Sequence, residues 1–266
     1  MDPFWPSLAA KMATSAAIVV AASRVVERTG PLVGALVATL PVSAGPAYLF
    51  LGLEHGADFV AASALTSLAT NVGVAAFILV YALVGRRLAP APALGLAVGG
   101  WLATVLLATR LELGFGAALA LNALAYGAAM LLTRDLRTAS APPRARGRWW
   151  DVPMRALLVM GLVALVVWSG RRLGPGAAGI AALMPVTLTS LALVLHPRLG
   201  GPAVAAVMAH SLPGMMGFTL AVASLVLTPR HLGLAGALLA ALTLCLAWNV
   251  VLFGLARRAA PRSMAS

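Results

Sequence analysis

Residues 30–43 read GPLVGALVATLPVS, and residues 174–187 read GPGAAGIAALMPVT. Both stretches open on Gly-Pro, continue through apolar residues and reach Pro-Val followed by a hydroxyl residue, and they lie 144 residues apart. The same offset pairs residues of less common types, namely Trp5 with Trp149, Lys11 with Arg155, Arg28 with Arg172, Ser67 with Ser211 and Gly73 with Gly217. This agreement in one register indicates an internal repeat, which in a membrane protein is typical of transporters.

The composition indicates a polytopic membrane protein. Of the 266 residues, 61% are hydrophobic and 10% are charged, whereas soluble domains average about 25% charged residues. The net charge of +12 comes mainly from arginines in the predicted loops, where they set topology and meet anionic lipid headgroups, so nucleic-acid binding is not expected. A single cysteine, Cys245, excludes a disulfide framework and a multi-cysteine metal site. No metal or cofactor is expected.

The hydrophobic pattern predicts nine membrane spans, each of about 20 mostly apolar residues. They lie at residues 7–26, 31–53, 58–84, 91–109, 113–133, 152–170, 175–196, 201–227 and 232–256. The longest polar stretch contains Pro142-Pro143 and five arginines. We interpret residues 134–151 as a basic cytoplasmic linker between a first membrane repeat at 1–133 and a second at 152–266.

The distribution of basic residues predicts how the chain crosses the membrane. With the N-terminus outside, 14 of the 19 lysines and arginines fall on the inner side and five on the outer side. Basic residues gather on the cytoplasmic side, which favours an outer N-terminus and a cytoplasmic C-terminus. Five spans would precede the second repeat. Because five is an odd number of crossings, the second repeat would enter the membrane from the opposite face to the first. The expected fold is therefore an all-α polytopic membrane protein with a 5+4 inverted repeat and proline-broken helices 2 and 7.

The inversion depends on the fourth predicted span. Residues 113–133 are similar to 232–256 at both ends, whereas nothing in the second half matches 91–109. If residues 91–109 do not cross the membrane, the two repeats are parallel.

The two proline-containing spans provide the first candidate site. Pro41 and Pro185 lie ten residues beyond the prolines that open their spans, which places them near mid-membrane. A proline there frees backbone carbonyls, which must find a partner or line a polar cavity. Hydroxyl residues follow at Ser43, Thr187 and Thr189. We expect these residues to bind substrate; the alternative is a structural kink satisfied by hydroxyls and neighbouring helices.

The long spans that follow the proline-containing spans provide further substrate-binding candidates. One contains Thr70 and Asn71, and the other contains His210 and Ser211. Ionisable residues inside a span are costly and usually functional, which favours His210. The alternatives are a neutral histidine bonded across a helix interface and an asparagine that holds helices together.

Two arginines are candidates for steering an anion toward the site. Arg28 and Arg172 stand just before the Gly-Pro of each proline-containing span; the alternative is ordinary contact with lipid headgroups. All seven carboxylates fall at or near predicted loops, which argues against a carboxylate proton relay. Because no motif combines a nucleophile with a base and an orienting group, no catalytic residues are expected and the protein is not expected to be an enzyme.

The stretch Ala178–Leu188 combines glycine, several aliphatic residues, proline and a hydroxyl residue. It resembles a segment of the small GlpM-like bacterial inner-membrane proteins, and residues 31–53 are similar in a weaker form. The resemblance implies a tandem duplication of such a unit in the bacterial inner membrane. That family has no settled activity, so the resemblance assigns no catalytic residues.

These patterns predict a secondary-type transporter or translocase that moves a small anionic or amphipathic substrate by alternating access. The alternative is a non-transporting membrane protein that acts as an assembly or scaffold partner and has a dry interior. The expected partners are membrane lipids and the substrate. A homodimer is left open.

Overall fold

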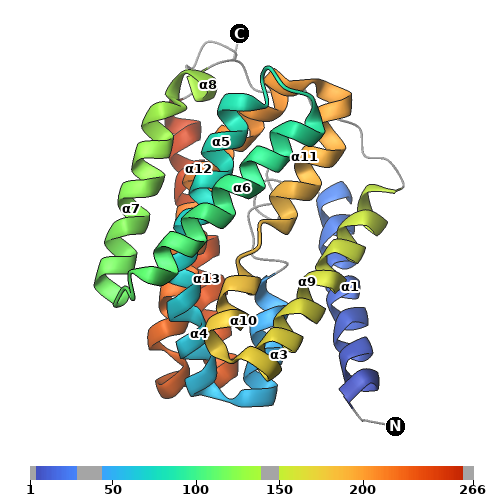
Figure 1. Ribbon diagram of the computed structural model, residues 1–266, viewed down its shortest axis with the longest axis vertical. Helices are drawn as coiled ribbons and strands as arrows, with labels where there is room; N and C mark the ends of the chain where they lie inside the picture. Colours follow the sequence, from blue (N-terminus) through green and yellow to red (C-terminus); the bar gives the residue numbers. More distant parts are fainter. Residues whose placement is uncertain (1–3, 29–43, 139–149, 260–266) are drawn as a thin grey trace.

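The computed structural model describes residues 4–28, 44–138 and 150–259, except for the side chains of residues 4, 22–28, 138 and 256–259. Every element in these ranges is a helix, and most helices run along the long axis of one bundle (Figure 1). In chain order they are α1 (Phe4–Arg28), α3 (Ala44–His55), α4 (Ala57–Thr70), α5 (Val72–Val84), α6 (Pro90–Arg110), α7 (Phe115–Leu132), α8 (Arg134–Thr138), α9 (Asp151–Leu173), α10 (Pro175–Ala182), α11 (Val186–Leu199), α12 (Gly201–Leu227) and α13 (Pro229–Ala259).

Seven stretches among the described residues are long and apolar enough to cross a membrane. They are Ala57–Val84, Pro90–Arg110, Phe115–Leu132, Asp151–Leu173, Pro175–Leu199, Gly201–Leu227 and Pro229–Leu255. These seven match the third to ninth predicted spans, including the fourth. The apolar part of α1, Trp5–Ala21, is shorter than a spanning helix, and the second predicted span lies partly outside the described residues. The chain is thus an all-helical protein of multi-pass membrane type.

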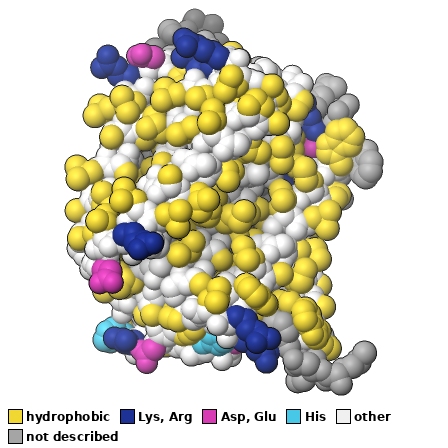
Figure 2. Space-filling view, viewed as in Figure 1, with side chains coloured by type: hydrophobic (Ala, Val, Ile, Leu, Met, Phe, Trp, Pro, Cys, Tyr) yellow, Lys and Arg dark blue, Asp and Glu magenta, His cyan; other side chains and the backbone are white. Residues whose placement is uncertain are grey.

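Burial separates a core from an outer layer. In the most apolar window of Ala57–Val84, 72% of the residues are buried, and the figure is 61% for Pro175–Leu199. The corresponding share falls to 17% in Pro229–Leu255. Apolar side chains cover much of the visible face, and most of its charged side chains lie toward the two ends, apart from a basic and an acidic group partway along the left side (Figure 2). That surface suits a hydrocarbon environment flanked by two polar layers.

The helix over 175–199 is interrupted at Pro185, as predicted. Helix α10 ends at Ala182, and α11 begins at Val186 with Pro185 as its N-cap at φ −77° and ψ 53°. Proline has no N–H to continue the ladder, and its ring clashes with the preceding turn. Pro41 and Ser43, where the corresponding break is predicted, lie outside the described residues.

The corners that lead from α3 into α4 and from α11 into α12 have the same backbone form. Gly56 and Gly200, which are 144 residues apart, have φ angles of 85° and 79°. Only glycine adopts this left-handed region without a steric cost from Cβ. Each glycine is the single residue that connects one helix to the next.

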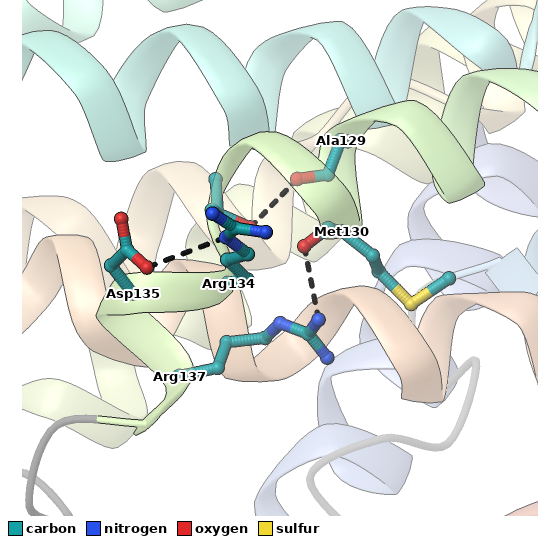
Figure 3. Close-up of polar contacts among 6 residues, drawn as sticks. Ala129, Met130, Arg134, Asp135 and Arg137 are labelled. Carbon is teal, nitrogen blue, oxygen red and sulfur yellow. Dashed lines mark hydrogen bonds and ion pairs between the residues drawn. The ribbon is translucent and has the colours of Figure 1, made fainter.

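The basic linker predicted after residue 133 begins with a short helix, α8, that closes the end of α7 (Figure 3). Thr133 Oγ1 donates a hydrogen bond to the carbonyl of Ala129 (2.7 Å), and Arg137 Nη2 donates to the carbonyl of Met130 (2.9 Å). Carbonyls at a helix C-terminus lack helical partners, and a positive charge there is favourable. The first residues of the linker therefore complete α7.

Helices α4 and α10 approach each other at backbone distance. A Cβ added to Gly179 would lie 2.3 Å from the carbonyl oxygen of Ser63. A Cβ at Gly176, one turn earlier in α10, would meet no atom closer than Thr66 Oγ1 at 3.9 Å. Small residues at a membrane-helix interface allow such close packing.

We expect Gly179→Ala to destabilise the protein by about 1–3 kcal/mol, because a methyl group there must push the two helices apart. The matched variant Gly176→Ala has room and should leave stability unchanged or raise it, since alanine favours helix. Melting temperatures of the two detergent-solubilised proteins measure the difference. Equal melting temperatures would show that α10 does not contact α4 in this way.

Candidate functional site

The break in the α10–α11 helix is connected to α3 and α4 by two hydrogen bonds. Tyr48 in α3 donates its hydroxyl to Ser67 Oγ of α4 (2.5 Å), and Ser67 Oγ donates to the carbonyl of Gly179 in α10 (2.7 Å). Both side chains are buried. In a continuous helix the amide of Leu183 would bond to Gly179, but here it donates to Ile180 (3.2 Å). Ser67 therefore supplies the donor that the break removes.

The second carbonyl affected by the break is also satisfied. Pro185 has no N–H to donate to Ala181, and the amide of Met184 donates there instead (3.1 Å). An unpaired backbone group in hydrocarbon costs several kcal/mol, so such compensation is expected wherever a membrane helix is interrupted. Two of the carbonyls affected by the break, those of Gly179 and Ala181, thus find donors within the protein.

A second buried polar group surrounds Asn71, which separates α4 from α5. Asn71 Nδ2 donates to Asn122 Oδ1 of α7 (2.8 Å) and to Thr219 Oγ1 of α12 (2.9 Å). Asn122 Nδ2 donates to the carbonyl of Leu68 in α4 (2.7 Å), and the Tyr126 hydroxyl lies 3.5 Å from Asn71 Oδ1. Because both asparagines use their amide donors between helices, this network, which we call the Asn71 network, joins three elements of the core.

The remaining predicted site residues do not gather at one point. Thr70, which is buried, bonds back to the carbonyl of Thr66 in its own helix (2.8 Å). After the break, Pro185 is buried, Thr189 is half-buried and Thr187 is exposed.

His210 in α12 and Arg172 at the end of α9 lie on outer faces. His210 is exposed, and its Nδ1 lies 2.8 Å from the carbonyl of Ala206. Ser211 donates to the carbonyl of Met208 (2.7 Å). Arg172 is exposed at the end of α9, which is consistent with headgroup contact, and the side chain of Arg28 is not among those described.

Several residues of these buried groups were missed by the sequence analysis. They are Tyr48 in α3, Asn122 and Tyr126 in α7, and Thr219 in α12, and they lie on helices that are mostly apolar. Spacing within one helix gives no signal for them, because their partners come from other helices. Buried asparagines inside apolar helices were a usable signal, and it was applied to Asn71 but not to Asn122.

Ion pairs lie near the C-terminal ends of α3 and α11. Lys11 in α1 pairs with Glu54 near the end of α3, and their side chains are 12% and 23% exposed. Asp151, the first residue of α9, accepts two hydrogen bonds from Arg198 near the end of α11 (2.9 and 2.6 Å). Fork-like pairing of this kind is the strongest geometry for arginine and carboxylate. The first pair connects α1 to the end of α3, and the second connects the start of α9 to the end of α11.

A cavity of about 370 Å³ lies between α3, α12 and α13, with α1 at its edge. Its lining is almost wholly apolar, although Tyr48 contributes its ring to one wall. Within the ranges that the structure describes, no three histidine, cysteine or acidic side chains converge where they could hold a metal ion. The described interior can therefore offer neutral hydrogen bonds and apolar contact.

No family model, curated protein or solved structure matches this chain. The GlpM-like resemblance stays a prediction.

We expect Asn122→Ala to destabilise the protein by about 1–2 kcal/mol, because it leaves Asn71 without one of its partners in a dry interface. Asn249→Ala is the matched control: Asn249 is also buried, but it donates within its own helix to the carbonyl of Cys245 (2.8 Å). Thermal or denaturant unfolding in detergent measures both variants. A larger loss for Asn249→Ala would contradict the structural role of the Asn71 network.

Proposed function

We propose that this protein is a secondary-type transporter that works by alternating access and is built from an inverted repeat. The observation that carries the proposal is the interruption at Pro185 of the α10–α11 helix, which is the second most buried of the seven candidate spans among the described residues. Broken helices of this kind form the substrate sites of many transporters, with half-helix ends pointing at the cargo. The N-terminus of α11 carries the positive end of its dipole, which favours an anionic or polar group on the substrate.

Helix boundaries support the repeat. Helices α3 and α11 end at His55 and Leu199, and the helices that follow begin at Ala57 and Gly201. Both pairs of residues are separated by the offset of 144 that relates the two sequence motifs.

Packing against tryptophan supports α6 as the counterpart of α13. A Cβ at Gly73 would lie 3.0 Å from Trp101 of α6, and a Cβ at Gly217 would lie 2.7 Å from Trp248 of α13. The two glycines are 144 residues apart. These contacts favour residues 90–110, and not the predicted 113–133, as the partner of the last helix. In that arrangement α7 is the extra span that connects two four-span units.

The positions of the two glycine corners support inversion. The corner between α3 and α4 lies at the lower end of the bundle, and the corner between α11 and α12 lies at the upper end (Figure 1). The ion pairs follow the same pattern, since Glu54 and Arg198 are also 144 residues apart and each binds the first helix of its own half. Equivalent corners at opposite ends are what a two-fold axis in the membrane plane produces.

The non-transporting scaffold is the second candidate, and one observation favours it. Ser67, Met184 and the Asn71 network satisfy polar groups at the two helix breaks from within the protein. Breaks that are bridged by the protein's own groups suit a static partner of a larger complex. The two candidates therefore differ in whether water reaches the start of α11.

We expect Thr187→Cys to react with a membrane-impermeant maleimide, because a transport pathway brings water to the break. The background is Cys245→Ala, which removes the one native cysteine. Leu193→Cys, also exposed but further along α11, is the control, and it should stay unreactive because lipid covers it. Labelling rates are measured in vesicles from each side. If Thr187→Cys is as unreactive as Leu193→Cys from both sides of the membrane, the result favours the scaffold and contradicts the transport proposal.

The proposed location is the bacterial inner membrane, with the N-terminus outside and the C-terminus in the cytoplasm. We expect reporter tags at the two termini to lie on opposite faces, because nine crossings leave the ends on different sides. A parallel repeat, in which residues 91–109 do not cross, would place both tags on the same face. Protease protection of each tag in oriented vesicles measures the outcome.

A further inference from the structure

The apolar cavity at the N-terminal end of α3 has a buried inner wall. Tyr48, Ala221 and Val222 line it and are each no more than 3% exposed. Its volume of about 370 Å³ lies within the range of small-molecule sites in proteins. Native interiors are otherwise close-packed, so an unfilled space of this size requires an explanation.

The edge of the cavity lies on the outer surface of the helices. Ile18 of α1 and Leu242 of α13 line it and are each 39% exposed. Helix α13 belongs to the outer layer of the bundle, and an exposed leucine midway along a membrane-spanning helix faces hydrocarbon. The cavity therefore opens sideways toward lipid tails.

The chemistry of the lining selects the occupant. None of the described lining residues is charged, and Tyr48, the one among them with a hydroxyl, donates it to Ser67. A polar or ionic group placed here would lose its hydration without gaining a partner. A hydrocarbon chain has no hydration to lose on leaving the lipid tails, and in the cavity it makes dispersion contacts with the apolar lining.

We propose that this cavity binds one hydrocarbon chain of a membrane amphiphile, entering between α1 and α13. The inference deepens the proposed function: if the protein transports, its substrate is an amphiphile whose tail lies here. The tail would contact the ring of Tyr48, whose hydroxyl reaches the Gly179 carbonyl through Ser67. Tyr48 and Ser67 thereby connect a tail bound in the cavity to the α10–α11 break.

Gly45→Leu provides a direct test. Gly45 lines the cavity, and a Cβ added to it meets no atom within 4 Å, so a leucine there extends into open space. Gly127→Leu is the matched control, because Gly127 in α7 also has open space around it but lies outside the cavity. Ala241→Phe fills the cavity from α13 and serves as the second variant. Melting temperatures establish that each variant folds.

The probe is a fatty acid carrying a diazirine, photolysed with the full-length protein in nanodiscs, and adducts are mapped by mass spectrometry. We expect adducts on the α12 and α13 segments that line the cavity, suppressed by excess unlabelled fatty acid. Gly45→Leu and Ala241→Phe should lower this saturable labelling at least fivefold, and Gly127→Leu should retain it. The proposal is overturned if labelling never saturates. It is also overturned if Gly45→Leu and Ala241→Phe both fold and both retain the labelling in full.

Two further measurements distinguish bulk lipid from cargo. If phospholipid co-purifies with the wild-type protein and is lost from Gly45→Leu, while reconstituted wild type moves no amphiphile, the cavity site stands and the transport proposal falls. If wild type moves a labelled amphiphile between leaflets and Gly45→Leu does not, the occupant is the cargo and both proposals stand.

Discussion

Every backbone polar group inside a lipid bilayer must find its partner within the protein, and this requirement controls the rest of the structure. Pro185 removes one donor from the α10–α11 helix, and the turn at Leu183 that precedes it releases the carbonyl of Gly179. Ser67 satisfies that carbonyl from α4 (2.7 Å), which is feasible because Gly179 lets the two backbones approach closely. The proline, the serine and the glycine act as one unit, since a break without its donor would cost several kcal/mol.

The same requirement explains why polar side chains in the core occur as connected groups. Asn71 and Asn122 lie on different helices and complete each other's hydrogen bonding, with Thr219 as a third partner. The pairs Lys11–Glu54 and Asp151–Arg198 do the equivalent for charges at the ends of the bundle.

The proposed function combines a polar break with an apolar cavity. Tyr48 belongs to both: its ring forms part of the cavity wall, and its hydroxyl begins the chain of hydrogen bonds to Gly179. An amphipathic substrate needs both environments, one for each of its ends. The described core contains satisfied neutral donors in place of a carboxylate relay, so recognition through shape and dipoles suits it better than charge pairing.

The sequence by itself determined the membrane class, seven of the nine predicted spans to within a few residues, and the break at Pro185, because hydrophobic length and proline chemistry act locally. Tertiary structure decided that the side chain of His210 is exposed, and it decided which partners Tyr48 and Asn122 bind. In a chain that is 61% hydrophobic, most helices are apolar on every face, so no periodicity tells which face is inward. That orientation, and the cavity it leaves, follow from how small residues let particular helices meet.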